Sequence, residues 1–250
     1  MSRTVLDLSV PVLSKLSLLL YGAPNVGKTR LLGDAIFHMS SNPDAKIKFI
    51  NMAGEDGYMS VSGYDIPDGV AETIETLADL TEIINEGPYD LLCLDSLAIV
   101  SKLTVAAVTK GVRVPVMTKE KNEWTEIHLI FETLLRRLLN SSTFFLTTTH
   151  AQMHEDPITG ETRISPEFEG AKQTLIVKKM FDMIAYLTAS TNAKGVVDRR
   201  ILVKPMAKGT KDAPGVVTKQ RLTRTITEDI AVPEGDGVFE KFITIIKAHV

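Results

Sequence analysis

The sequence has almost no cysteine and no long apolar run. Cys93 is the single cysteine among 250 residues, so a disulfide framework is excluded and a reducing compartment fits. No apolar stretch approaches the ~20 residues that a membrane-spanning helix needs. The hydrophobic region at the first residues is too short for a secretion signal. We therefore expect a cytoplasmic protein with no membrane partner.

Apolar runs bounded by turn residues alternate with helical spacing through the first 190 residues. The predicted strands are 17–21, 47–52, 91–94, 143–147 and 183–188, and the predicted helices are 28–39, 70–85 and 122–139. This alternation predicts a single α/β domain over 1–250, with a mostly parallel twisted sheet covered by helices on both faces. Two β-like runs, 196–203 and 216–226, predict antiparallel strands added at the C-terminal side. Residues 101–121 and 151–172 fit neither pattern and are expected to be loops.

The net charge of −3 hides an uneven distribution. Residues 194–224 contain nine Lys or Arg against two Asp, a net charge of +7, so the remainder of the chain carries −10. This region belongs to a basic, β-rich extension at 190–230. A basic segment on an acidic protein indicates a polyanion or an acidic neighbouring subunit as its partner, and the alternative is a solvated surface hairpin.

Residues 22–29 read Gly-Ala-Pro-Asn-Val-Gly-Lys-Thr, a full match to the phosphate-loop pattern G-x4-G-K-[ST]. Glycines let successive backbone N–H groups converge on phosphate oxygens, and the helix that follows presents its positive N-terminus to them. Lys28 is expected to reach the β- and γ-phosphates, and the Thr29 hydroxyl to bind Mg²⁺. The predicted nucleotide-binding residues are Gly22, Ala23, Pro24, Asn25, Val26, Gly27, Lys28, Thr29 and Arg30.

Two acidic residues follow predicted strands. Asp95 ends an apolar run, where the carboxyl ends of parallel strands gather ligands, so it is predicted to hold Mg²⁺ beside Thr29. Ser96 could cap the next segment or assist at the metal, and the cap is the favoured interpretation. Glu55 follows the second strand and could orient and deprotonate a water molecule. Asp56 is the competing candidate, and a plain Glu-Asp-Gly turn is the alternative.

Motifs of other phosphate-loop proteins are missing. Without an Asn-Lys-x-Asp motif a GTPase is not expected, and without Leu-Ser-Gly-Gly-Gln neither is a transporter ATPase. Asp95 is followed by Ser96 rather than by Glu, so the base does not stand next to the metal-binding acid as it does in many AAA+ proteins. The sequence therefore predicts ATP as the nucleotide and a base supplied from elsewhere, with Glu55 as the candidate.

The order of these motifs resembles that of RecA-like ATPases. The closer resemblance is to the small phage-encoded RecA-like ATP-binding proteins. It rests on four motifs in order: a phosphate loop, a strand followed by Glu55, the run Leu-Leu-Cys-Leu-Asp-Ser, and a last strand that reads Phe-Phe-Leu-Thr-Thr-Thr-His at 144–150. The similar region spans about 15–210. The resemblance implies a DNA-stimulated ATPase in the host cytoplasm, which binds single-stranded DNA beside a single-strand-binding protein. It also implies homologous recombination or strand annealing by a ring or filament of identical subunits.

The resemblance also implies roles for individual residues. Glu55 would be the hydrolytic base, and His150 a polar sensor of the γ-phosphate, although a capping or partly buried histidine is the alternative. Lysines of the basic segment would reach a neighbouring subunit's nucleotide; the candidates are Lys204, Lys208 and Lys211. The N-terminal segment, 1–14, could add a strand to a neighbouring subunit or form an ordinary edge strand.

The two expected loops differ in charge. Residues 101–121 carry +4, which suits contact with DNA phosphates, and the predicted DNA-binding residues are Lys102, Lys110, Arg113 and Lys119. Residues 151–172 carry −3 and have Phe168 as their only aromatic residue, which makes a poor platform for stacking bases. The first loop and the basic segment are therefore expected to supply most of the attraction for DNA.

Two other functions are compatible with the same motifs. One is a DNA motor or loader of the helicase type. The other is an ATP-binding regulatory protein that assembles with partners and hydrolyses little. The response of ATP hydrolysis to single-stranded DNA, and the unwinding of duplex DNA, separate these three.

Overall fold

The computed structural model describes residues 15–55, 57–111, 114–118, 122–191, 195, 197–204, 214–222, 224–232 and 237–249. The predictions for 1–14, Asp56, Arg113, Lys119, Lys208 and Lys211 lie outside these residues. Within the described ranges, no helix is long and apolar enough to cross a membrane.

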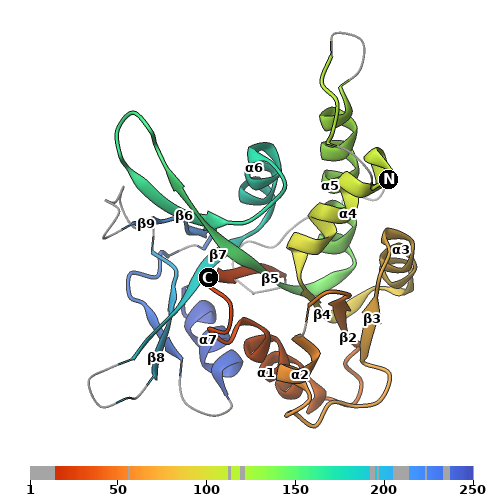
Figure 1. The fold of residues 1–250 in the computed structure, drawn as a ribbon. Helices are drawn as coiled ribbons and strands as arrows, with labels where there is room; N and C mark the ends of the chain where they lie inside the picture. Colours follow the sequence, from red (N-terminus) through yellow and green to blue (C-terminus); the bar gives the residue numbers. More distant parts are fainter. Residues whose placement is uncertain are drawn as a thin grey trace, which may run out of the picture.

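Strands and helices alternate along most of the chain (Figure 1). The strands are β1 Leu16–Gly22, β2 Ile47–Met52, β3 Ala71–Ile74, β4 Tyr89–Asp95, β5 Ser142–Glu155, β6 Thr162–Pro166, β7 Met183–Thr191, β8 Val197–Leu202, β9 Gly215–Val216, β10 Lys219–Gln220 and β11 Ile230–Val232. The helices are α1 Lys28–Ser40, α2 Gly57–Val61, α3 Leu77–Glu86, α4 Leu97–Thr109, α5 Glu123–Asn140, α6 Ala171–Met180 and α7 Val238–Lys247.

The sheet is mostly parallel. Its order is β11-β8-β7-β1-β5-β4-β2-β3, and the strands from β7 to β3 run parallel to their neighbours. Strands β8 and β11 are antiparallel additions beyond β7. The predicted RecA-like α/β architecture, with antiparallel strands at the C-terminal side, is confirmed. Strand β5 lies between β1 and β4, so the ends of all three strands meet at one edge.

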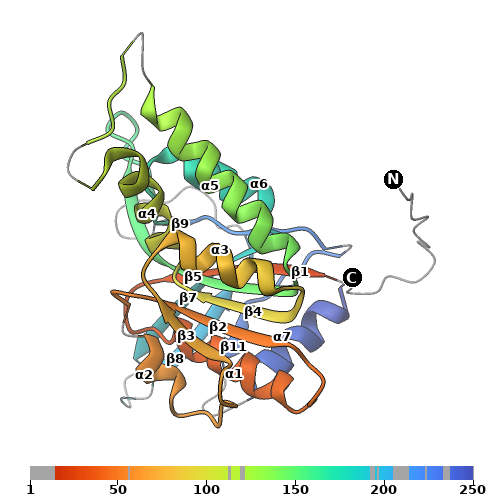
Figure 2. The ribbon, with the colours of Figure 1, turned by 90° about the vertical axis from the view of Figure 1, so that its right-hand side faces the viewer.

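Helices cover both faces of this sheet (Figure 2). Helices α1 and α7 pack on one face, whereas α3, α5 and α6 belong to the core on the other. The residues of β1 alternate between the two: Leu18 and Leu20 belong to the first core, and Leu19 and Tyr21 to the second. Because both faces are buried, the strand reads as one continuous apolar run, which is why the sequence pattern located it.

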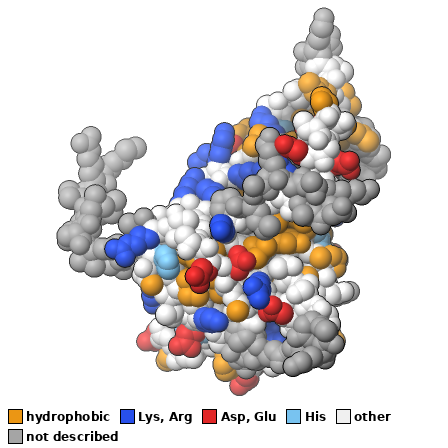
Figure 3. All heavy atoms as spheres, turned by 90° about the vertical axis from the view of Figure 1, so that its left-hand side faces the viewer, with side chains coloured by type: hydrophobic (Ala, Val, Ile, Leu, Met, Phe, Trp, Pro, Cys, Tyr) orange, Lys and Arg blue, Asp and Glu red, His pale blue; other side chains and the backbone are white. Residues whose placement is uncertain are grey.

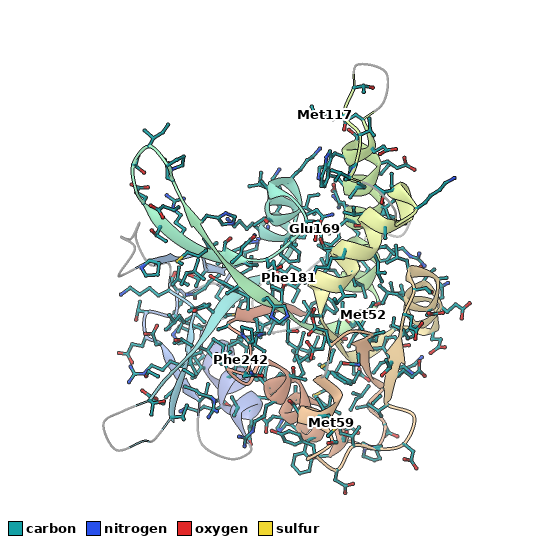
Figure 4. The ribbon with its side chains drawn as sticks, in the orientation of Figure 1. Met52, Met59, Met117, Glu169, Phe181 and Phe242 are labelled. Atoms are coloured by element: carbon teal, nitrogen blue, oxygen red, sulfur yellow. The ribbon has the colours of Figure 1, made fainter. Side chains whose placement is uncertain are left out.

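The prediction of a loop at 101–121 is wrong for its first half. Residues 101–109 belong to α4. The helical spacing of apolar residues is interrupted here, because Ser101 and Thr104 are polar yet buried, where they hydrogen-bond with Gln173 of α6. The backbone N–H of Glu169 also donates to the Ser101 hydroxyl at 2.9 Å, which connects α4 to the segment before α6. Figure 4 labels Glu169 near α6.

The expected loop at 151–172 is also regular structure. Strand β5 continues to Glu155, turns, and returns as β6, and α6 begins at Ala171. The predicted helix at 70–85 begins later, at Leu77, because Thr76 and Asp79 form a capping box there. Its first residues instead form β3, which pairs with β2.

Candidate functional site

The phosphate loop joins β1 to α1 at the carboxyl edge of the sheet. Asn25 and Gly27 have positive φ values of 63° and 101°, a conformation that glycine adopts without strain. Gly27 is the N-cap of α1, so the loop lies at the positive end of that helix. A cleft of about 270 Å³ opens above it, lined by the loop, by residues that follow β2, by residues at the end of β4 and by residues of β5.

Lys28 lies inside the curve of the loop. Its Nζ donates hydrogen bonds to the carbonyl oxygens of Gly22, at 3.1 Å, and Ala23, at 2.8 Å. The side chain is buried, and this burial lowers the pKa of Lys28, although Asp95 and Glu55 act in the opposite direction. Among the described residues, the hydrogen-bond partners of this buried ammonium group are carbonyl oxygens, and an ammonium group that faces a cleft in this way fits a phosphate ligand.

Asp95 and Thr29 are in contact. The Thr29 hydroxyl donates to Asp95 Oδ2 at 2.6 Å, and the Thr148 hydroxyl hydrogen-bonds to Oδ1. Burial raises the pKa of Asp95, and the two hydroxyl hydrogen bonds lower it. Carboxylate and hydroxyl oxygens are ligands that suit Mg²⁺. No group of three or more His, Cys, Asp or Glu side chains that could hold a metal ion occurs in the described part of the chain.

Glu55, the predicted base, lies between two polar side chains. The Ser96 hydroxyl donates to Glu55 Oε1 at 2.7 Å, and His150 Nε2 is 3.5 Å from the same oxygen. The Ser96 prediction is therefore wrong in part: the residue occupies the N-cap position of α4, but its side chain makes no capping hydrogen bond. The peptide between Asp95 and Ser96 is cis.

The position of His150 follows from strand register. His150 of β5 pairs with Gly22 at the end of β1, so it lies where the phosphate loop begins. Its Nδ1 is buried and has no hydrogen-bond partner among the described residues. The structure thus brings together the three residues predicted to be catalytic, Lys28, Glu55 and His150, at one cleft.

Sequence reasoning missed Gly57, the first residue of α2. A Cβ atom placed on Gly57 would overlap Asp95 Oδ2 and would lie 3.1 Å from Thr29 Cγ2. Only glycine allows α2 to approach the Thr29–Asp95 pair this closely. The sequence signal was present, because Gly57 ends the Glu-Asp-Gly run, but the run was interpreted only as a source of the base or as a turn.

Arg199 was also missed. It comes from the antiparallel strand β8, and its Nε donates to the carbonyl oxygen of Val26 at 3.1 Å. One cation of the basic segment therefore contacts the phosphate loop of the same chain. Sequence spacing gave no signal for this contact, since it depends on the pairing of β8 with β7.

The remaining predicted residues that the structure describes do not line the cleft. Arg30 is exposed, with its Nε 3.4 Å from the Tyr64 hydroxyl. Lys102 and Lys110 are exposed on α4 and at its C-cap, and Lys204 is exposed after β8. Figure 3 shows Lys and Arg side chains gathered in the upper left part of one face.

Fold and site together define a P-loop protein with a RecA-like sheet. The chain belongs to the AAA domain family, whose model matches residues 14–222. No curated protein matches it. Among solved structures, it is similar to a KaiC-like protein from Pyrococcus horikoshii (15% identity, 88% of this chain and 86% of that chain, TM-score 0.49). It is also similar to the flagellar accessory protein FlaH from Methanocaldococcus jannaschii (12% identity, 88% and 85%, TM-score 0.47).

Proposed function

We propose that the protein binds ATP with magnesium and hydrolyses it, with Glu55 as the general base. The observation that supports this most directly is that Lys28, Asp95 and Glu55 line one cleft above the phosphate loop, although they lie at or beyond the ends of three different strands. A lysine for phosphate, an oxygen pair for a metal ion and a second carboxylate to position water are the parts that phosphoryl transfer to water requires.

Each side chain has a distinct task in this proposal. Lys28 exchanges its carbonyl partners for oxygens of the β- and γ-phosphates. Thr29 and Asp95 hold magnesium, which neutralises charge that develops on those oxygens. Glu55 orients a water molecule and accepts its proton as the water oxygen bonds to the γ-phosphorus. The bond from that phosphorus to the leaving oxygen breaks, and the products are ADP and phosphate.

We further propose that the protein binds single-stranded DNA and acts in homologous recombination or annealing as a homo-oligomer. The sequence resemblance to phage-encoded RecA-like proteins supports this proposal, and so do the exposed Lys102 and Lys110. His150 lies on the strand that continues directly into the β5–β6 hairpin. DNA bound at that hairpin would therefore be connected to Glu55 through β5, because His150 of β5 contacts the Glu55 carboxylate.

The test is ATP turnover with and without single-stranded DNA, in the wild-type protein and in Glu55→Gln. We expect magnesium-dependent turnover that DNA stimulates. We expect Glu55→Gln to bind ATP normally and to lose roughly 10²–10⁴-fold in turnover, the contribution of a general base. Undiminished turnover in Glu55→Gln would remove the residue from its role. ATP-driven unwinding of duplex DNA would favour the motor. ATP binding with little turnover and no response to DNA would favour the regulatory protein.

A further inference from the structure

A second cleft, of about 430 Å³, lies between the β5–β6 hairpin and α6. In the hairpin, Gln152 pairs with Ser165 and His154 pairs with Arg163. Side chains two positions apart share one face of a strand, so these four residues form one wall. Helix α6 supplies the other wall, and Figure 1 shows the hairpin projecting beside this helix.

Two cations face this cleft. Lys178 of α6 is half-buried and makes no ion pair within the part of the chain that the structure describes. Arg163 is half-exposed, and its guanidinium is 3.7 Å from Glu161. Burial lowers the pKa of Lys178, and the charge of Arg163 lowers it further. An anion between these side chains would stabilise both charges.

The floor of the cleft is apolar. Phe168 and Val217 line it, and Leu175, a large hydrophobic residue that is 54% exposed, stands at its side. Ser165 and Thr174 add hydroxyl groups. A ligand that matches both parts has an anionic group attached to a flat body with an apolar face and hydrogen-bonding edges. A nucleotide has this chemistry.

We propose that this cleft binds one nucleotide unit of single-stranded DNA, with its phosphate between Arg163 and Lys178 and its base on the apolar floor. The proposal rests on the DNA part of the proposed function. It also changes the expectation, based on net charge, that residues 151–172 contribute little to DNA binding. The net charge of 151–172 is negative, but Glu155, Asp156 and Glu161 gather around the turn of the hairpin, whereas the wall toward α6 carries Arg163 and faces Lys178.

The chain carries a reporter beside the cleft. Trp124 is its only tryptophan. A Cβ atom on Gly170, which lines the cleft, would be 3.5 Å from the Trp124 ring. A nucleotide in the cleft would change the surroundings of this ring, so tryptophan emission reports occupancy without a label.

The experiment measures the binding of a labelled oligothymidylate at several salt concentrations, with a non-hydrolysable ATP analogue present throughout. Arg163→Gln and Lys178→Gln are the test variants, Lys178→Arg retains the charge, and Lys247→Gln is a control at an exposed lysine on α7. We expect each test variant to weaken binding several-fold and to reduce the salt slope by about 0.7, the value for one contact on a single strand. Arg163→Gln and Lys178→Gln should both lose the change in Trp124 emission on binding DNA. Lys178→Arg and Lys247→Gln should behave like the wild type. ATP turnover without DNA should be unchanged in all four variants.

The outcomes separate this proposal from the proposed function. If the wild type and both glutamine variants bind single-stranded DNA with the same affinity and the same salt slope, the proposed nucleotide cleft is refuted and the proposed DNA binding stands. If the wild type binds no single-stranded DNA at low salt, the proposed DNA binding and the proposed nucleotide cleft are both refuted. ATP turnover without DNA still tests the proposed ATPase activity in that case. If free thymidine monophosphate competes at equal nucleotide concentration, the ligand is a free nucleotide, and the strand assignment is overturned.

Discussion

The Ser96 hydroxyl donates a hydrogen bond of 2.7 Å to Glu55 Oε1. The two residues are far apart in the sequence, and they meet because β2 and β4 are parallel neighbours whose carboxyl ends coincide. His150 Nε2 stands 3.5 Å from the same oxygen. Contacts from Ser96, which follows β4, and from His150 of β5 thus hold the carboxylate proposed as the base. It lies near Asp95, the acid proposed to bind the metal, but it follows a different strand.

Replacing Ser96 by alanine is expected to slow ATP turnover without weakening ATP binding. The substitution leaves Glu55 in place but frees its carboxylate to leave the position of the attacking water. Because a general base contributes roughly 10²–10⁴-fold, a loss of about tenfold in kcat is expected, with KM nearly unchanged. Steady-state kinetics check this, and Ser96→Thr, which keeps a hydroxyl group, should recover most of the rate. An unaltered kcat in Ser96→Ala would show that the hydrogen bond is only structural.

Replacing Lys28 by alanine is expected to abolish ATP binding. The ammonium group is the only lysine charge among the residues that line the cleft, and a charged hydrogen bond to phosphate is about twice as strong as a neutral one. Titration with a fluorescent ATP analogue measures the effect. Lys102→Ala, at an exposed lysine of α4, is the control and should bind ATP like the wild type. Wild-type affinity in Lys28→Ala would refute the site.

The sequence located the phosphate loop and the central strands because their signals are local. A glycine-rich motif between an apolar run and a helical pattern is readable in a single stretch, and β1 is buried on both faces. Helix α4 was missed because Ser101 and Thr104 in its middle are buried and polar, with a partner on α6 that no local pattern reveals. Arg199 depends on a strand pairing far from the loop that it contacts.

The raised pKa of Asp95 predicts how the stability of the protein changes when this carboxylate is removed. Burial raises this pKa above its ordinary value, so the folded state without metal is penalised for keeping the group ionised at neutral pH. Asp95→Asn is therefore expected to unfold at equal or higher denaturant concentration than the wild type at pH 7 without magnesium. The difference should shrink as the pH falls toward about 4, where the aspartate becomes protonated in both states.

The same Asp95→Asn variant should lose the stabilisation that magnesium with ATP gives the wild type, because the carboxylate oxygen that faces Thr29 is gone. Denaturant unfolding, with and without magnesium and ATP, measures both effects. A variant that is destabilised without metal, yet is still stabilised by magnesium with ATP, would contradict the assignment of Asp95.

A side chain on Gly57 is expected to damage the metal site. The added Cβ of Gly57→Ala would overlap Asp95 Oδ2, so either α2 or the carboxylate has to move, at a cost of about 1–3 kcal/mol in stability. Magnesium-dependent ATP turnover should fall as well. Gly63→Ala is the matched control, because nothing lies within 4 Å of a Cβ there and its φ is not in the left-handed region. Equal stability and turnover in the two variants would contradict the close packing of α2.

Replacing Arg199 by glutamine is expected to weaken ATP binding through the phosphate loop. Its Nε donates to Val26 at 3.1 Å, and losing a hydrogen bond from a charged group costs roughly 1.5–3 kcal/mol. The loop would then sample other conformations, so KM for ATP should rise several-fold while kcat changes little. Arg200→Gln is the control, since Arg200 lies next to it on β8 but is exposed and pairs with Asp198. If the two variants have the same KM, the contact with Val26 does not support the loop. If only Arg199→Gln shifts KM, then the antiparallel strands beyond β7 help to shape the nucleotide site.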